Sequence, residues 1–401
     1  MRNSKLVIGI LSVAAVSAGQ LYAADPVGIG VSPGVRLFPS ISAAVEHSDN
    51  YYFSDGTIVP EESATVFVVE PGLLMQMRGS TTQLDLGANA EVGFVDTGSE
   101  DDYLDTEVFG DLTFQPALRH QIRLGLKRQD DHDPFGSART EGTVLANRSL
   151  DEFSNTIYNA AYRFGAPDAR INVEVGYAGQ DKSYQTNRAA TRFLDFDRAG
   201  PNGKLIVNVS PKTALVAIAS RAEVEYDNVR AGVAPRDATE TAYLVGAEWN
   251  ATAKTTGKVA VGRLDRDYDS PARRDSDGAT WVASIDWAPT ARDEVTLSTS
   301  RANEESFLDG ADAIDTRTVG LNWVHRWTPR ISSQLGIQDI DADFDGSTRR
   351  DDIVQGVAGL AYQLNRAWSI AGLYRLSERD STLPIRDYET NRFTLGVTFA
   401  P

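Results

Sequence analysis

Polar and apolar residues alternate along most of this chain, and short turns cut the alternation at nearly even intervals from about residue 35 to the end. Such alternation places successive side chains on opposite faces of a β-strand. Beyond the N-terminal region, no segment has the roughly 20 consecutive apolar residues that a membrane helix needs, so a closed sheet is the only structure that could carry this chain through a membrane. The pattern is typical of a transmembrane β-barrel.

The alternation predicts eighteen strands in nine hairpins. Their expected ranges are about 37–48, 64–78, 82–94, 104–116, 119–130, 150–164, 170–181, 192–209, 213–226, 238–250, 254–267, 278–288, 293–303, 314–327, 330–343, 351–363, 366–378 and 387–400. The eighth contains Gly200-Pro201-Asn202-Gly203, which is either a bulge in one long strand or a turn. Sixteen strands is therefore the alternative count.

The connections between these strands are of two alternating kinds. One kind is short, as at Gly79–Thr81 and Thr328-Pro329, and the other is longer and acidic, as at Asp49–Glu62 and Gln129–Asn147. Bacterial outer-membrane barrels have short periplasmic turns and long external loops. The expected fold class is all-β: a single antiparallel up-and-down transmembrane β-barrel in the outer membrane of a Gram-negative bacterium. The longest loop, Gln129–Asn147, either folds into the lumen or is a disordered external loop.

The ends of the chain have features of their own. Residues 1–24 are expected to be a signal peptide, because two positive charges precede the run Leu6–Gly19 and small residues follow it. Residues 25–36 would be a short periplasmic segment and residues 37–401 the barrel. Barrel proteins usually end in an aromatic residue, whereas this chain ends in Phe399-Ala400-Pro401, so the insertion signal is displaced by two residues.

Composition excludes several functions. The 401 residues include no cysteine, which rules out disulfides and thiolate metal sites, and the net charge of -17 argues against nucleic acid as a partner. The four histidines have no metal-ligand spacing, and no Gly-x-Ser-x-Gly motif is present. We therefore do not expect an enzyme.

Charged residues on the expected lumen face are the candidate solute-binding residues. They are Glu107, Asp111, Arg123, Lys127, Glu174, Arg221, Glu223, Glu225, Arg375 and Arg392. In one interpretation they are polar because water fills the pore, and they pair with one another across it. In the other, opposed acidic and basic walls create a transverse field that orients a passing solute.

One segment has the spacing of a calcium-binding loop. Asp341, Asp343 and Asp345 alternate ahead of Gly346, and Asp352 occupies the twelfth position. Two features argue against a calcium site: the twelfth residue is Asp where Glu is usual, and two arginines lie inside the loop. The favoured interpretation is a strand that continues above the membrane with acids on one face, as part of an acidic rim that binds divalent ions shared with lipopolysaccharide phosphates. No other cofactor is expected.

Three segments near the N-terminus carry a family resemblance. Gly34–Ser42 (GVRLFPSIS), Glu46–Tyr52 (EHSDNYY) and Val69–Leu73 (VEPGL) resemble the opening of the "putative β-barrel porin 2" family, and the resemblance covers essentially the whole mature chain. Members are outer-membrane barrels often associated with loci for capsule or exopolysaccharide production. The resemblance implies a pore for export of exopolysaccharide or capsular polysaccharide, and it carries over no catalytic residues.

Two other functions stay open beside export. A general or substrate-selective diffusion porin fits the size and the polar lumen face, and a structural or adhesive outer-membrane protein would use the acidic loops. The expected partners are outer-membrane lipid and lipopolysaccharide, polysaccharide or small hydrophilic solutes, and periplasmic export components.

Overall fold

The computed structural model describes residues 27–58, 60–141, 149–252, 254–306, 308 and 311–401. The expected signal peptide, residues 1–24, lies outside them. Among the described residues, no helix is long and apolar enough to cross a membrane.

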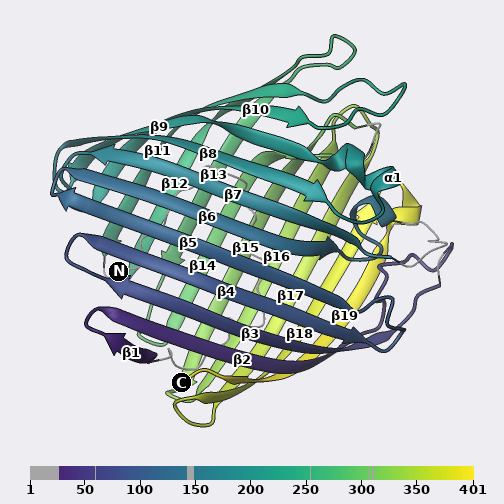
Figure 1. The fold of residues 1–401 in the computed structure, drawn as a ribbon, viewed down its shortest axis with the longest axis horizontal. Coiled ribbons are helices and arrows are strands. Elements are labelled where there is room, and N and C mark those ends of the chain that lie inside the picture. Colours follow the sequence, from purple (N-terminus) through teal and green to yellow (C-terminus); the bar gives the residue numbers. More distant parts are fainter. Residues whose placement is uncertain (1–26, 59, 142–148, 253, 307, 309–310) are drawn as a thin grey trace.

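Strands make up most of the described chain (Figure 1). They are β1 (Ile29–Ser32), β2 (Val35–Ser48), β3 (Ala64–Arg78), β4 (Thr82–Val95), β5 (Tyr103–Ala117), β6 (His120–Asp133), β7 (Asp151–Phe164), β8 (Ile171–Tyr184), β9 (Phe196–Ser210), β10 (Thr213–Tyr226), β11 (Ala238–Thr252), β12 (Thr255–Tyr268), β13 (Ser276–Trp287), β14 (Asp293–Glu305), β15 (Ala313–Thr328), β16 (Ile331–Phe344), β17 (Arg350–Gln363), β18 (Trp368–Ser381) and β19 (Tyr388–Phe399). The helical pieces are α1 (Arg188–Thr191) and the 3-10 turns Ala138–Thr140, Arg192–Leu194 and Pro384–Arg386.

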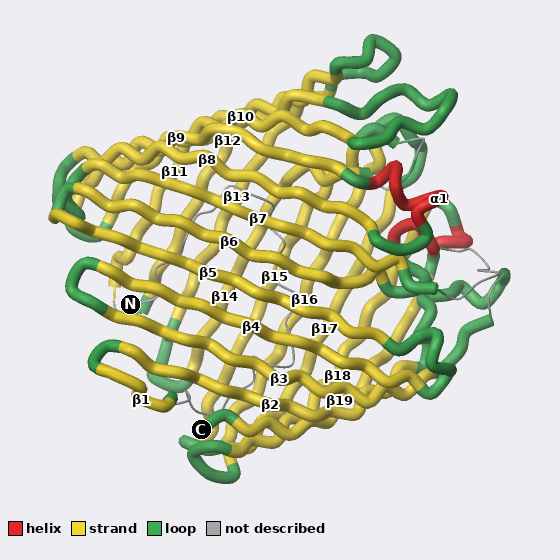
Figure 2. The backbone as a smooth tube through the Cα atoms, viewed as in Figure 1, coloured by secondary structure: helices red, strands yellow, loops and turns green. Residues whose placement is uncertain are grey.

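The strands from β2 to β19 form a closed antiparallel ring. Each pairs with its neighbours in the sequence, and β19 pairs with β2 from Phe399 opposite Ile41 to Arg392 opposite Ser48. Of the 19 strands in the described chain all but β1 belong to the ring, so the predicted count of eighteen is confirmed. Figure 2 shows the short turns gathered at one end of the barrel and the long loops at the other.

Strand β9 decides between the two predicted counts. Asn202 lies opposite Ser220 and Ala199 opposite Glu223, so β9 keeps one register with β10 on both sides of the Gly-Pro-Asn-Gly segment. That segment is therefore part of one long strand and not a turn.

Strand β1 completes the seam where the ring closes. β19 pairs with β2 only from Ile41 onward, and β1 pairs with the remaining edge of β2, with Ile29 opposite Leu37. The Gly28 amide donates to the carbonyl oxygen of Pro401 at 3.2 Å. The residues beyond Phe399 thus hydrogen-bond at the seam, next to the segment expected to be periplasmic.

The outer face is apolar over much of the strands, as predicted. Ile122, Leu124 and Leu126 of β6 alternate with less exposed residues, and Phe393 and Leu395 of β19 do the same. Exposed apolar residues on the outside of a closed barrel form the surface that faces lipid.

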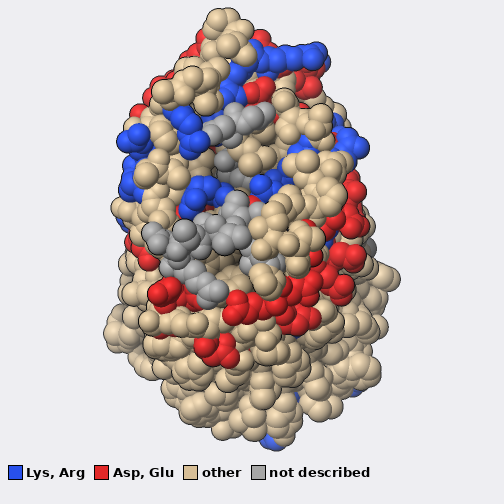
Figure 3. Space-filling model, turned by 90° about the vertical axis from the view of Figure 1, so that its right-hand side faces the viewer, with Lys and Arg blue, Asp and Glu red and all other residues tan. Residues whose placement is uncertain are grey.

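The interior is not uniformly polar, and here the predicted apolar-out, polar-in pattern is wrong for one side. Ile206, Val216, Ile218, Leu244 and Ala260, from β9 to β12, face inward and form a buried apolar cluster. These strands lie along the upper edge of the barrel in Figure 1, and its outline tapers toward that edge in Figure 3. We attribute the packing to this taper, because a narrow edge brings inward side chains close enough to exclude water.

Candidate pore and its lining

The loop between β6 and β7 turns back over the opening of the barrel. Phe135 packs on Tyr52, with ring centroids 6.0 Å apart. The carboxylate of Glu141 lies 2.8 Å from Nη1 of Arg349 and 2.5 Å from Nη1 of Arg379, two residues on the far side of the lumen. The part of this loop that the structure describes therefore reaches across the pore, which corresponds to the first of the two alternatives for this loop.

These contacts are buried and strongly polar. Glu141, Arg349 and Arg379 are each almost inaccessible to solvent. Burial alone would lower the pKa of Arg349, but its hydrogen bonds to Asp351 and Glu141 raise that pKa above the ordinary value. Breaking such an ion pair leaves an uncompensated buried charge, so the loop is held firmly in place.

A cavity of about 720 Å³ lies between this loop and the inner wall of β14–β19. Its lining combines hydroxyl, amide, aromatic and guanidinium groups. Among the lining residues are Phe53, Ser137, Thr296, Ser298, Asn322, Gln334, Gln338, Gln355, Arg375, Arg379, Tyr388 and Arg392. This side of the lumen is wide enough for a small hydrophilic solute.

Two arginines lie beside one acid on part of this wall. Arg375 and Arg392 each place Nη1 3.5 Å from an oxygen of the same residue, Glu46, and Thr394 also donates to that carboxylate at 3.0 Å. The guanidinium of Arg392 lies over the ring of Phe53, 4.8 Å from its centroid. One carboxylate therefore serves two arginines beside the cavity.

The opposite wall, from β5 to β9, is balanced in charge. Lys127 lies 2.7 Å from Glu107, and Arg123 is paired with Glu174. Asp111 lines a small cavity of about 70 Å³ with Arg123 and Glu174. On this wall, an acid pairs with a base of the adjacent strand or of the next strand but one.

Figure 3 shows the end of the barrel that carries the long loops. Lys and Arg side chains border a hollow in the middle of this face, while Asp and Glu side chains gather below it and to the right. The entrance to the pore is therefore lined by positive charge and partly surrounded by negative charge.

The structure places most of the predicted lumen residues inside the barrel. Seven of them lie on the strand face opposite the exposed outer residues: Glu107, Asp111, Arg123, Lys127, Glu174, Arg375 and Arg392. Their role toward a solute stays a prediction.

Three predicted lumen residues lie on the outer face instead. Arg221, Glu223 and Glu225 are exposed and alternate with buried Val224 and Tyr226. The reason is the interior apolar cluster: β10 has apolar residues on both faces, so the polarity of its side chains could not reveal which face is outside.

The segment with calcium-loop spacing forms a hairpin. β16 extends to Phe344 and β17 begins at Arg350, so a tight turn joins two paired strands, with Asp341 directly opposite Asp352. Asp343 pairs with Arg350 and lies 3.8 Å from Arg317. The acids thus line one face of a hairpin, which is the interpretation that the sequence favoured.

The remaining acid of that motif lies elsewhere. Asp345 lines a separate cavity with Asp312 and Asp315. Burial first, and then the charges of Asp315 and Asp312, raise the pKa of Asp345 above its ordinary value. It therefore does not converge with Asp341 and Asp352 on a common point.

A buried ionic cluster that the sequence did not indicate lies on the side of the apolar interior. Arg266 of β12 is 0% exposed, and its Nη1 atom lies 2.8 Å from Glu240 and 2.8 Å from Glu305. Glu240 also pairs with Arg198. The partners are separated by 26 to 42 residues in the chain, so no local motif marks them.

A closed barrel with an apolar outer face, a partly polar lumen and a loop across the opening defines an outer-membrane, porin-like channel. The chain belongs to the "putative beta-barrel porin 2" family, whose family model matches residues 23–400. The family therefore indicates a location in the outer membrane, and porins are not enzymes. The resemblance seen in the sequence is confirmed.

The other comparisons find no match or only low similarity. A search of curated proteins found no match. Among solved structures, OpdK from Pseudomonas aeruginosa is 11% identical, with 91% of this chain and 99% of that chain covered and a TM-score of 0.45. OccK2 (OpdF) from the same organism, in complex with glucuronate, is 13% identical, with 91% and 98% covered and a TM-score of 0.48. The FrpB iron transporter from Neisseria meningitidis is 8% identical, with 91% and 81% covered and a TM-score of 0.45.

Proposed function

We propose that this protein is a substrate-selective channel of a Gram-negative outer membrane, through which small anionic hydrophilic solutes such as acidic saccharides pass along the β14–β19 side. The observation that carries the proposal is the cavity of about 720 Å³ whose described lining residues include Arg375, Arg379 and Arg392 and no acidic residue. Guanidinium groups attract anions and can bind a carboxylate through two hydrogen bonds.

The rest of the lining fits the neutral part of such a solute. Gln338, Gln355 and Asn322 offer amide donors and acceptors that match sugar hydroxyl groups. Tyr388 and Phe53 offer aromatic surface beside them. The wall therefore combines hydrogen-bonding, apolar and cationic contacts, as a site for an acidic saccharide would.

Export of exopolysaccharide or capsular polysaccharide is the second candidate, because the same groups would also contact the residues of a sugar chain. The loop weighs against it. Glu141 joins the loop to Arg349 and Arg379 across the opening, and these buried contacts would have to break before a polymer could pass. We therefore place small solutes ahead of polymers.

The test is single-channel conductance in planar bilayers, with saccharides added to one side. We expect a monomeric uronate to interrupt the current at lower concentration than the matched neutral hexose. Long anionic oligosaccharides should block only from outside the constriction. Prolonged blockades that lengthen with the oligosaccharide would instead support threading of a polymer, and equal effects of uronate and hexose would contradict the selectivity for anions.

A further inference from the structure

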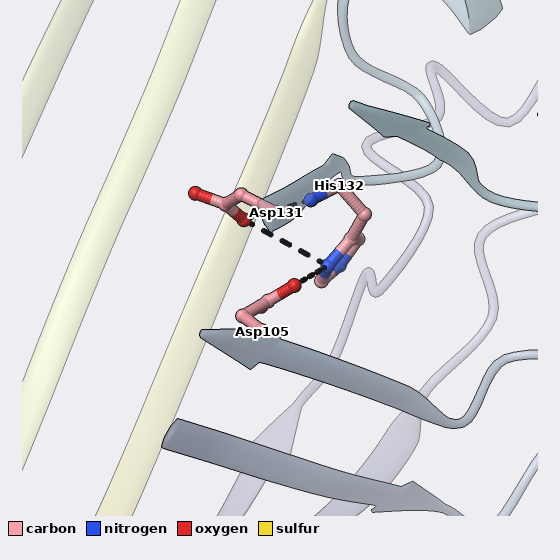
Figure 4. Close-up of side chains that lie close together, drawn as sticks. All are labelled: Asp105, Asp131 and His132. Carbon is pink, nitrogen blue, oxygen red and sulfur yellow. Dashed lines mark hydrogen bonds and ion pairs between the residues drawn. The ribbon is translucent and has the colours of Figure 1, made fainter. Parts of the chain in front are cut away.

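Two carboxylates and an imidazole converge at the end of β5 and β6 that carries the long loops. Nδ1 of His132 lies 2.9 Å from Oδ1 of Asp105 and 4.0 Å from Oδ1 of Asp131. Figure 4 shows both carboxylates directed at the same ring nitrogen. Within the described part of the chain, this is the only group of three carboxylate or imidazole side chains whose ligand atoms all lie within 4.8 Å of one another.

The cluster differs from other acidic residues of the inner wall in its charge balance. Glu107, farther along β5, has Lys127 as its partner at 2.7 Å, and Glu174 has Arg123. Among the described residues, neither Asp105 nor Asp131 has a Lys or Arg nitrogen within 4.0 Å. Their ion pairs within this distance are with an imidazole, which is a weak base, so neither carboxylate has a described lysine or arginine in direct contact.

The ammonium group of Lys182 interacts electrostatically with Asp131 but lies against aromatic rings. Nζ of Lys182 lies over the ring of Phe153, 3.8 Å from its centroid, and 4.8 Å from the centroid of Tyr184. Tyr184 donates its hydroxyl to Asp133 at 2.8 Å. Aromatic rings thus hold the ammonium group, and Asp133 has its own partner.

The spacing of the three ligand atoms suits one metal ion. Bonds from a divalent transition ion to imidazole nitrogen or carboxylate oxygen are about 2.1 Å long, so neighbouring ligands of an octahedral ion lie about 3.0 Å apart and opposite ligands about 4.2 Å apart. The observed separations of 2.9 and 4.0 Å fall close to these two values.

The surroundings would hold the ligands and leave room for others. The ring of Tyr103 packs on the ring of His132, with centroids 4.6 Å apart, and the Tyr103 hydroxyl donates to Glu91 at 2.8 Å. The side chain of His132 is 12% exposed, whereas that of Asp131 is 41% exposed. The imidazole is therefore fixed by packing, and water or a solute can reach the open side of the site.

We propose that Asp105, Asp131 and His132 form a binding site for a divalent transition metal ion at the mouth of the barrel. The imidazole favours Zn²⁺ or Ni²⁺ over Ca²⁺ and Mg²⁺, which prefer all-oxygen ligands. β6 ends at Asp133 and the loop that crosses the opening follows directly. A bound ion would join β5 to β6 at the base of that loop.

The test is isothermal titration of the full, folded barrel in detergent, prepared without a histidine tag, with ZnCl₂, NiCl₂, CaCl₂ and MgCl₂ in turn. The expected result is one Zn²⁺ or Ni²⁺ per chain, with clearly weaker binding of Ca²⁺ and Mg²⁺. His132→Ala and the nearly isosteric Asp105→Asn should each weaken Zn²⁺ binding by at least about tenfold, because each removes one ligand.

His325→Ala is the matched control. Nδ1 of His325 also lies against a carboxylate, 2.7 Å from Oδ1 of Asp293, but no second carboxylate of the described residues joins this pair. We expect Zn²⁺ binding to be unchanged in this variant. The proposal is overturned if the native barrel binds no Zn²⁺ or Ni²⁺, or if His132→Ala and Asp105→Asn, each folded by heat-dependent electrophoretic migration, bind as the native protein does.

Discussion

The two sides of the barrel interior are built from the same kind of strand but differ in what fills them. On the side of β9–β13, Val216 and Ile218 belong to an apolar cluster, and the buried Arg266 pairs with two carboxylates. On the side of β14–β19, a cavity is lined by amides, hydroxyls and arginines. The comparison teaches that alternation along a strand determines which residues face inward, whereas the shape of the barrel decides whether those residues meet water or one another.

The comparison predicts its largest effect at Arg266. Arg266→Ala leaves Glu240 and Glu305 without this buried partner, and we expect a loss of about 3–5 kcal/mol in the free energy of unfolding. The measurement is denaturant unfolding of the barrel in detergent, followed by tryptophan fluorescence. Arg263→Ala in the same strand is the control, because Arg263 is exposed and its ion pairs with Asp265 and Asp277 are solvated. Equal losses in the two variants would contradict a closed interior on this side.

A smaller effect is expected from the apolar cluster. Ile218 is 4% exposed, and Ile218→Ala should lower the free energy of unfolding by about 2–5 kcal/mol, as deletion of packed methyl groups does. Ile353→Ala makes the same change on the side of the cavity, at an inward residue of β17 that is only half-buried. It should cost clearly less in the same unfolding assay. A larger loss from Ile353→Ala would mean that the two sides have been assigned the wrong way round.

Much of the fold could be predicted from the sequence because the signals for the strands and turns of a barrel are local. Ile122, Leu124 and Leu126 reveal the outer face of β6 within a few residues, and each hairpin turn follows its strand directly. The count of eighteen strands required only that the residues on both sides of Pro201 belong to the same strand, β9. These signals require no knowledge of contacts distant in the chain.

The site was less predictable because its contacts are distant or depend on shape. Glu141 and Arg379 are 238 residues apart, and nothing near either residue indicates the other. The sequence predicted a lumen position for Arg221 because β10 is apolar on both faces. The taper of the barrel, which makes the inner face of β10 apolar, cannot be inferred from the sequence of β10 alone. Asp341 and Asp352 had calcium-loop spacing, but a paired hairpin satisfies the same spacing.

The substitutions that we expect to disturb the structure least also give the most direct test of the proposed pore. The measurement is the reversal potential of the open channel in a salt gradient, for the native barrel and for the double variant Arg375→Ala, Arg392→Ala, with Arg221→Ala as the matched control on the outer face. If anions pass along the β14–β19 wall, the double variant should lose anion preference while Arg221→Ala keeps the native reversal potential. A native reversal potential in the double variant, with the barrel folded and conducting, would contradict the account.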